Sequence, residues 1–329
     1  MISIDSSHSL ARYRFSAWEL LPAAAAIAYF FVRPDYLSLG AGIFVTAIFA
    51  ISLDLLIGFA GIITLGHSVF FGLGAYAAGL LARSGWAEPI SVVLLSAAVA
   101  ALAAAVTGPF VLKLKGLPLI MVTLGIAAVA YEVANKFDWL TGGHDGLPSL
   151  TYAPIFGLFR WSMYGTTGYV YSFIWLTVVI LVARMVVCSS FGVALQGIRQ
   201  NALRMRVIGA PVLLQSVIIY TISAALAGIG GALYAQTNSF VGLDTLSIDQ
   251  GVFALAMVVL GGIGRLYGAL LGAVVYNLVQ DSAQQWNPYY WMFAIGVMLV
   301  LVVRFGKGGL LGIASDLGNR LLARAGARP

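Results

Sequence analysis

The chain has 329 residues, of which 61% are hydrophobic and only 9% are charged, and its formal net charge is +6. A soluble globular protein carries about 25% charged residues, so this composition excludes an ordinary soluble domain. Apolar runs of about 17–25 residues, long enough to cross a hydrocarbon core of about 30 Å, recur along the sequence. We therefore expect an all-α polytopic membrane protein, because helices satisfy their own backbone hydrogen bonds within lipid.

Ten apolar segments follow one another along the chain as candidate transmembrane helices. The first is interpreted as a retained helix rather than a signal peptide, because no convincing cleavage site follows it. The eighth and ninth are short and are separated by glycines, which predicts that some helices are broken at glycine clusters. The ten segments are 17–32, 38–57, 62–82, 89–112, 117–136, 167–187, 212–236, 250–264, 266–280 and 290–303.

The distribution of Lys and Arg predicts the orientation, because cytoplasmic loops carry an excess of these residues. With the N-terminus in the cytoplasm, all but four of the 18 basic residues lie at cytoplasmic ends. The four exceptions are Arg33, Arg83, Lys136 and Arg160. Ten spans then place both termini in the cytoplasm, and the basic rim faces anionic lipid rather than nucleic acid.

The glycine-rich stretch Gly58–Gly79 contains six glycines and one histidine in an otherwise apolar run. Glycine costs about 0.8–1.0 kcal/mol relative to alanine in a helix interior. Small residues four positions apart offset this cost in membranes by letting helices approach closely, and such spacing predicts helix contact faces. Three sets show it: Ala75 with Gly79, Ala224 with Gly228, and Gly264 with Gly268 and Gly272.

Asp54 is the clearest charged residue within a predicted span. A carboxylate near the bilayer centre costs about 2.5–3.5 kcal/mol on insertion scales and usually faces the protein interior. Asp54 and His67 each have two possible roles: lining the translocation pathway, or forming a hydrogen bond between helices. The candidate translocation-pathway residues are Asp54, Thr64, Gly66, His67, Ser68, Thr123, Gly261 and Gly262.

Motifs of nucleotide, metal and nucleophile sites do not occur in the sequence. There is no G-x-x-x-x-G-K-[ST], H-E-x-x-H or G-x-S-x-G, and "FGKGG" at 305–309 lacks the P-loop glycine and hydroxyl. The three histidines are far apart, and the lone Cys188 cannot form an internal disulfide. We therefore expect no catalytic residue, no metal site and no cofactor in this chain.

A polar segment, 189–211, lies between the sixth and seventh apolar runs on the basic side. Gly209 can end a helix there, and Pro211 suits the first turn of the next. A short surface helix of this kind either lies on anionic lipid or docks on a cytoplasmic partner. Four residues share its apolar face: Ile198, Ala202, Met205 and Ile208.

Four regions of the sequence resemble the permease subunits of bacterial ABC importers for branched-chain amino acids. They occur in the family's order and extend over about two-thirds of the chain. They are "LDLLIGFAGIITLGHSVFFGLGAYAAGLL" from Leu53, "LKGLPLIMVTLG" from Leu114 with "LTGGHDGL" from Leu140, "GIRQNALRMRVIGAPVLLQSVIIYTISAALAGIGGALYA" from Gly197, and "ALAMVVLGGIGRLYGALLGAVV" from Ala254.

The resemblance implies a transport subunit of the bacterial inner or plasma membrane, with 1–329 as one transmembrane permease domain. The T-G-G-x-x-G at Thr141–Gly146 resembles one of two paired permease types, so the partners implied are a second homologous permease, two cytoplasmic ABC ATPases and an extracytoplasmic substrate-binding protein. The loop region 137–166 would face that binding protein. Its candidate residues are Thr141, Gly142, Gly143, Asp145, Asp244 and Asp249.

The resemblance also implies that 189–211 couples the permease to the ATPase through a helix at about 197–209. The general importer pattern is E-A-A, three residues and Gly; Gly209 fits it, whereas the aligned triplet is Leu203-Arg204-Met205. The candidate coupling residues are Arg199, Gln200, Asn201, Ala202, Arg204, Met205, Arg206 and Gly209.

The family resemblance leaves the substrate open. Leucine, isoleucine and valine are the first expectation, and urea, short amides and small carboxylates are the alternatives. The rival from another class is a secondary transporter driven by protons or sodium, which would use Asp54 or Glu132 and need no partner chain. A membrane enzyme is the second rival and would form product alone.

Overall fold

The computed structural model describes residues 26–31, 36–155, 157, 159, 161, 165–305 and 308–312. These residues form helices joined by loops, with two isolated antiparallel bridges, Leu147 to Val241 and Ile155 to Phe159. The all-α prediction is therefore confirmed for the described part of the chain. The first predicted segment, 17–32, lies outside it except for residues 26–31, which are helical.

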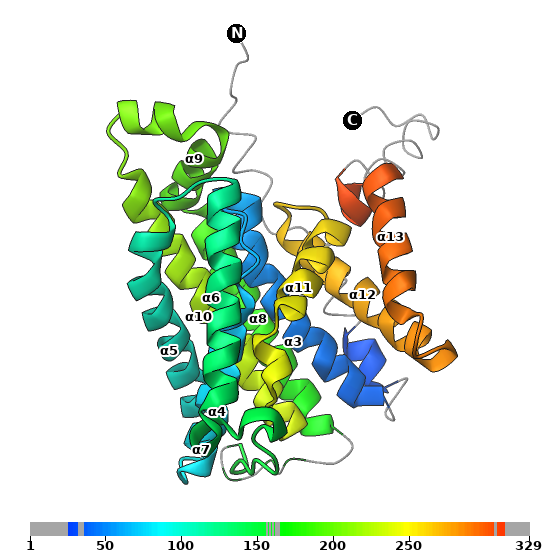
Figure 1. Ribbon diagram of the computed structural model, residues 1–329. Helices are drawn as coiled ribbons and strands as arrows, with labels where there is room; N and C mark the ends of the chain where they lie inside the picture. The colour runs from blue at the N-terminus through cyan, green and yellow to red at the C-terminus, as the bar shows by residue number, and fades with distance from the viewer. Residues whose placement is uncertain are drawn as a thin grey trace.

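The described helices form an elongated bundle with distinct ends (Figure 1). At one end lies α9, and at the other lie α7 and the loop that follows it. The elements are α3 (Leu37–Asp54), the π-helix η3 (Leu55–Ala60), α4 (Ser68–Arg83), α5 (Pro89–Val111), α6 (Leu117–Lys136), α7 (Asp138–Thr141), η4 (Gly143–Asp145), α8 (Thr166–Cys188), α9 (Ser190–Val207), α10 (Val212–Asn238), η5 (Leu243–Leu246), α11 (Ile248–Gly261), α12 (Leu266–Trp286) and α13 (Trp291–Phe305).

Fewer full-length spans than the ten predicted segments occur among the described residues. Five helices are long and apolar enough to cross a membrane: α3 continued by η3, α5, α6, α8 and α10. The pair α11 and α12 makes a sixth only if it counts as one span, because its two helices bend by 115° at their junction. α4 and α13 are apolar but shorter. The predicted glycine-rich break between the eighth and ninth segments is present between α11 and α12, but hydropathy did not indicate which other apolar runs are too short to span alone.

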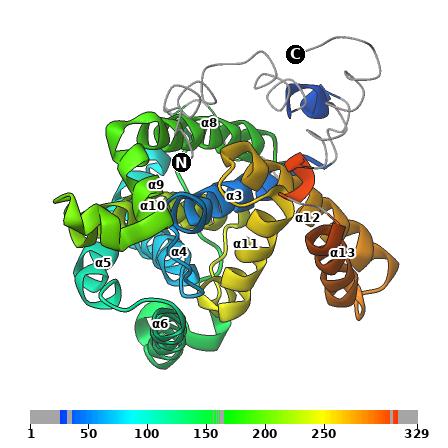
Figure 2. The same cartoon turned by 90° about the horizontal axis from the view of Figure 1, so that it is seen from above.

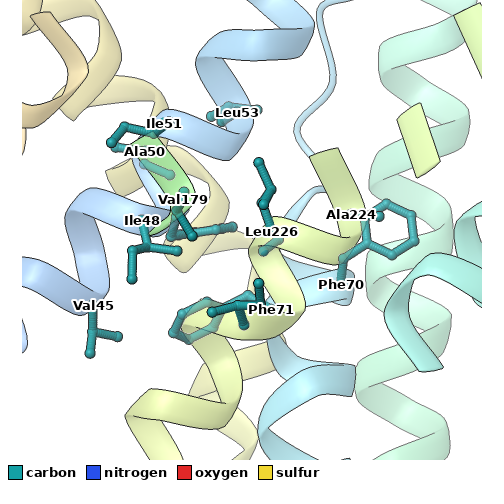
Figure 3. Close-up of a cluster of buried hydrophobic side chains, with 14 of the residues drawn as sticks. Val45, Ile48, Ala50, Ile51, Leu53, Phe70, Phe71, Val179, Ala224 and Leu226 are labelled. Carbon is teal, nitrogen blue, oxygen red and sulfur yellow. The ribbon is translucent and has the colours of Figure 1, made fainter. Parts of the chain in front are cut away.

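α3 forms the centre of the bundle. Its 18-residue apolar window, read together with η3, is 94% buried, whereas that of α6 is 22% buried. Viewed from above, α3 lies among α8, α10, α11 and α12 (Figure 2). The buried side chains around it come from several elements, with Ile48 and Ile51 of α3 near Phe71 of α4, Val179 of α8 and Leu226 of α10 (Figure 3).

Small residues allow the closest helix contacts, as their spacing predicts. α10 packs most extensively on α5 and α4. A Cβ added at Gly228 of α10 would lie only 2.7 Å from the Cβ of Ala100 in α5. A Cβ added at Gly272 of α12 would lie 2.8 Å from the backbone nitrogen of Gly261 in α11. Backbone-to-backbone approach of this kind stabilises helix association where lipid offers no hydrophobic driving force.

Candidate functional site

His67 lies in the interior, fully buried where α3, α4 and α10 meet. Its Nε2 atom is 3.0 Å from Ser52 Oγ of α3 and 3.3 Å from Ser223 Oγ of α10. The ring stacks on Phe49, with 5.7 Å between centroids, and packs edge-on against Phe70. This geometry is that of a polar contact that joins three helices, because a buried imidazole needs hydrogen-bond partners.

The neighbours of His67 in sequence connect it to α6 and α11. Thr64 is buried, and its hydroxyl accepts a hydrogen bond from the Gly66 amide at 3.3 Å. A Cβ at Gly66 would collide with the backbone of Thr123 in α6, so this glycine permits that approach. Ser68 is buried beside Gly251 of α11. The structure thus gathers these predicted pathway residues at one helix junction, and their role in a pathway stays a prediction.

Asp54 lies at the end of α3, where the helix changes to the π-helix η3, and it is fully buried. Its Oδ1 atom accepts a hydrogen bond from the backbone N–H of Gly264 at 2.7 Å. Gly264 lies in the break between α11 and α12, with φ at +80°. The carboxylate therefore satisfies a backbone donor that the broken helix leaves without an intrahelical acceptor.

Gly261 and Gly262 form the rest of the α11–α12 break. Gly261 abuts the backbone of Gly268 in α12, and Gly262 has φ at +109°. A Cβ at Gly309 would lie 2.6 Å from Gly262 Cα, so the chain after α13 packs directly on the break. The described glycines of the "FGKGG" stretch thus serve close packing at this position, which accounts for them without a nucleotide.

The segment α9 consists of two helices joined by a kink at Asn201, whose φ of −159° and ψ of 94° are not helical. Ser189 caps the first helix by accepting a hydrogen bond from Gly192 N at 3.3 Å. Asn201 caps the second, since its Oδ1 atom accepts from Arg204 N at 3.0 Å. The second helix ends before Gly209, which has φ at +89° and open space around it.

The kink changes which residues of α9 face outward. The sequence predicted one continuous apolar face that included Ile198 and Ile208, but Ile198 is buried whereas Ile208 is 74% exposed. The second helix instead presents Leu203 and Val207, which are 71% and 82% exposed. The predicted register fails because the non-helical backbone at Asn201 interrupts the helical period.

Arg199 is a predicted coupling residue whose side chain contacts the membrane helices. Its Nη1 atom donates a hydrogen bond to the carbonyl oxygen of Gly58 in η3. Its side-chain stem lies against Gly61, where an added Cβ would be 2.8 Å from Arg199 Cγ. Arg199, Gln200, Arg204 and Arg206 are all exposed residues of α9, and Arg199 differs in that its guanidinium reaches back to Gly58.

The T-G-G-x-x-G motif forms a compact loop at the opposite end of the bundle. The Thr141 hydroxyl donates to the carbonyl oxygens of Ala134, at 2.5 Å, and Phe137, at 2.9 Å. The glycines at 142, 143 and 146 all have positive φ. A Cβ at Gly142 would collide with the Gly146 carbonyl, so the motif residues are required by the shape of the loop.

This loop is joined to the segment after α10. Leu147 and Val241 exchange two backbone hydrogen bonds of 2.8 and 3.2 Å. The pairing brings Asp145 to the same end as Asp244 and Asp249, and all three acidic residues are exposed. Thr141 and Gly143, which were predicted for the same face, are buried beneath it.

Spacing along the chain did not indicate several residues of these contacts. Ser52 and Ser223 hydrogen-bond to His67, Gly264 N donates to Asp54, and Arg199 donates to Gly58 O. The two residues of each of these pairs are 15 to 210 positions apart in the sequence. The only sequence signal was the density of small and hydroxyl residues in each stretch. Among the described residues, no group of three His, Cys, Asp or Glu side chains is placed to hold a metal ion.

Comparisons with known proteins agree with the sequence resemblance. The chain is 27% identical over 316 residues to the high-affinity branched-chain amino acid transport system permease protein LivM of Salmonella typhimurium, covering 90% of this chain and 72% of that protein. It is 27% identical to LivM of Escherichia coli, covering 80% of this chain and 67% of the relative. It is also 28% identical to the autoinducer 2 import system permease protein LsrC of an Enterobacter species, covering 70% and 67%. No solved structure matches the chain.

The family model described as "Branched-chain amino acid transport system / permease component" matches residues 37–303. This range contains α3 through most of α13, and therefore the His67 junction, the α11–α12 break and α9. The chain belongs to this family and is a multi-pass membrane permease of the bacterial ABC importer type.

Proposed function

We propose that this chain is one of two permease subunits in an ATP-driven importer that carries branched-chain amino acids inward. Besides the family, the observation that carries the proposal is the second helix of α9. Its Leu203, Val207 and Ile208 side chains are exposed on the surface at one end of the bundle, next to the exposed Arg206. An exposed apolar patch with a polar rim is typical of a protein interaction site.

The proposed orientation places α9 in the cytoplasm and the T-G-G-x-x-G loop outside, with both termini cytoplasmic and ten membrane segments in all. In this arrangement 189–211 is the coupling segment, and two cytoplasmic ATPases supply the energy. An extracytoplasmic binding protein docks on 137–166 near Asp145, Asp244 and Asp249. A second, homologous permease completes the pore. The two-ended arrangement in Figure 1, with α9 opposite α7, supports this assignment.

The pathway is proposed to run beside the non-helical stretch between η3 and α4. Residues 61–64 have no regular structure, and Gly61 and Ile63 are exposed, whereas Thr64 and His67 are buried behind them. Broken transmembrane helices offer backbone N–H and C=O groups to a zwitterionic substrate. Two breaks of this kind, at Gly58–Gly66 and Gly261–Gly264, support a route between neighbouring subunits.

Leucine, isoleucine and valine are the proposed substrates, because two relatives are named as branched-chain amino acid permeases. The relative named as an autoinducer 2 permease makes that molecule the second substrate to test, ahead of urea, short amides and small carboxylates. The binding protein, rather than this chain, is proposed to select among them.

The test is uptake of radiolabelled leucine by cells that lack this gene and carry it back as wild type, Gly209→Asp or Gly85→Asp. Both glycines have a φ near +90° with nothing within 4 Å of an added Cβ, so the substitutions are matched in strain and space. Gly209 lies beside α9, and Gly85 lies in the α4–α5 turn at the other end. We expect only Gly209→Asp to abolish uptake and ATPase co-purification.

Three outcomes would contradict parts of the proposal. Equal uptake by the two variants would remove the coupling role of α9. Absence of uptake in cells carrying the wild type would remove the branched-chain assignment, and autoinducer 2 would be tested next. Uptake by the purified chain alone, driven by a proton or sodium gradient, would favour the secondary transporter instead.

A further inference from the structure

Four segments that are distant in sequence meet at one junction near the α9 end of the bundle. They are the end of α3, the π-helix η3, the α11–α12 break and the first helix of α9. Asp54, Gly58, Arg199 and Gly264 supply the contacts, and we refer to these four residues as the junction.

The centre of the junction is direct backbone contact between Gly58 and Gly264. A Cβ added at Gly58 would lie 2.5 Å from the nitrogen and 2.6 Å from the Cα of Gly264. No side chain fits in that space without displacing the α11–α12 break. The positions of η3 and the α11–α12 break are therefore fixed relative to each other, and neither can move alone without separating Gly58 from Gly264.

Asp54 and Arg199 close the junction from two sides. The Asp54 carboxylate accepts from Gly264 N, and the Arg199 guanidinium donates to Gly58 O. An added Cβ at Gly264 would lie 3.1 Å from Arg199 Nη1, so the guanidinium also touches the break. Hydrogen bonds with one charged partner are about twice as strong as neutral ones.

We infer that Arg199 is a positioning residue that ties α9 to the junction of η3 and the α11–α12 break, so that displacement of α9 is transmitted to both broken segments. The inference rests on the proposed function, in which α9 receives movement from an ATPase. It assigns Arg199 a role different from Arg204 and Arg206, which are exposed as Arg199 is, because the Arg199 guanidinium donates to Gly58 O in the membrane helices. It also makes Asp54 a hydrogen-bond acceptor for Gly264 rather than a proton carrier.

The geometry favours transmission of movement over local stabilisation alone. η3 is a π-helix, and such segments are often found at functional sites because their backbone hydrogen bonds are irregular. The α11–α12 pair turns by 115° at a break held by glycines with positive φ. Arg199 thus connects α9 to a π-helical segment and to the break where α11 and α12 turn, and a few residues at the end of an element can absorb a hinge movement.

The experiment uses the complete importer, with binding protein and ATPases, purified into proteoliposomes. Arg199→Met keeps the apolar stem against Gly61 but removes the donors, and Arg199→Lys restores one cation. Lys115→Ala is the matched control, because Lys115 is an exposed cation in the α5–α6 turn at the same end. The readouts are basal ATP hydrolysis, leucine taken up per ATP hydrolysed, and co-elution with the ATPases.

For Arg199→Met we expect the ATPases to co-elute with the permease and uptake per ATP hydrolysed to fall by about tenfold, within the usual range of coupling effects. Arg199→Lys should be intermediate, and Lys115→Ala should match the wild type. A wild-type coupling ratio in Arg199→Met would overturn the inference while leaving the proposed function intact. Loss of co-elution in Arg199→Met would also overturn it, by placing Arg199 in the ATPase contact.

Two further measurements separate the inference from a failure of folding or of the proposed function. Asp54→Asn keeps an acceptor oxygen for Gly264 N, so we expect it to retain uptake, whereas a proton-carrying carboxylate would lose it. Hydrogen exchange in Arg199→Met should rise in peptides covering 58–66 and stay unchanged in 201–208. Unchanged exchange at 58–66 would contradict the junction even if the wild-type importer moved no leucine.

Discussion

The two ends of this bundle hold their loops in different ways. At the α7 end, backbone hydrogen bonds cross between distant segments: Leu147 pairs with Val241, and Leu150 N donates to Ser239 O. At the α9 end, the second helix of α9 is capped and closed only by its own residues, as in the bond from Ala210 N to Met205 O.

This difference teaches what each end can do. A loop fixed by long-range backbone bonds presents a surface of constant shape, which suits recognition of another protein. The second helix of α9 packs on the core through Ala202 and Met205 but has exposed Leu203, Val207 and Ile208, and a segment with this much exposed surface opens locally at lower cost. In the proposed importer the rigid end receives the binding protein, and the movable end receives the ATPase. The predictions below alter one end at a time.

The largest effect is expected from Gly142→Ala in the T-G-G-x-x-G loop. The backbone there has φ at +75°, and an added Cβ would collide with the carbonyl of Gly146. Left-handed strain costs about 1–2 kcal/mol and overpacking about 1–3 kcal/mol, so the free energy of unfolding should fall by about 3 kcal/mol. Thermal unfolding of the detergent-solubilised protein measures this.

Gly85→Ala is the control for strain without collision at the same end, because Gly85 has φ at +90° and nothing within 4 Å. It should lower stability by about 1 kcal/mol only. If the two variants unfold at the same temperature, the packing of Gly142 against Gly146 does not hold the loop, and the α7 end is less rigid than argued.

A smaller loss, of about 1–2 kcal/mol, is expected from Thr141→Val. Valine has the shape of threonine but cannot donate to Ala134 O and Phe137 O, and it leaves Gly143 N without its acceptor at 3.3 Å. Thermal unfolding again measures the loss, with Thr141→Ser as the control that keeps the hydroxyl. If Thr141→Val unfolds at the wild-type temperature, the hydrogen bonds of the Thr141 hydroxyl do not stabilise the loop.

The contrast between the ends also shows what the sequence could reveal. The apolar runs predicted α3, α5, α6, α8 and α10, because hydrocarbon thickness imposes a length on each helix. Small-residue spacing predicted close contacts at Gly228 and Gly272, because only the absence of a side chain permits them. The T-G-G-x-x-G loop was noticed as a motif, but its fixation by Val241 depends on residues nearly a hundred positions away.

The α9 end was the harder one to predict. Hydrophobic periodicity assumed one helical face from Ile198 to Ile208, whereas Asn201 interrupts the helix and caps a second one. The inward contact of Arg199 with Gly58 joins residues 141 positions apart, and no local pattern carries that information. The 115° turn between α11 and α12 was foreseen only as a glycine-rich break, since composition gives no angle.

The smallest global effect is expected from Asn201→Ala, which removes the cap of the second α9 helix. Loss of an N-cap costs about 1 kcal/mol, but here the cost falls on a short exposed helix rather than on the bundle. The melting temperature should therefore stay within error of the wild type, while hydrogen exchange in 202–208 rises about fivefold, which is the population change that corresponds to 1 kcal/mol. Asn201→Asp retains an acceptor for Arg204 N and should exchange as the wild type does.

A fall in melting temperature comparable with that of Thr141→Val would mean that α9 is bound to the bundle as firmly as the α7 loop is. The proposed division between a rigid and a movable end would then be wrong, because a helix whose capping energy is shared with the whole fold cannot move independently of it.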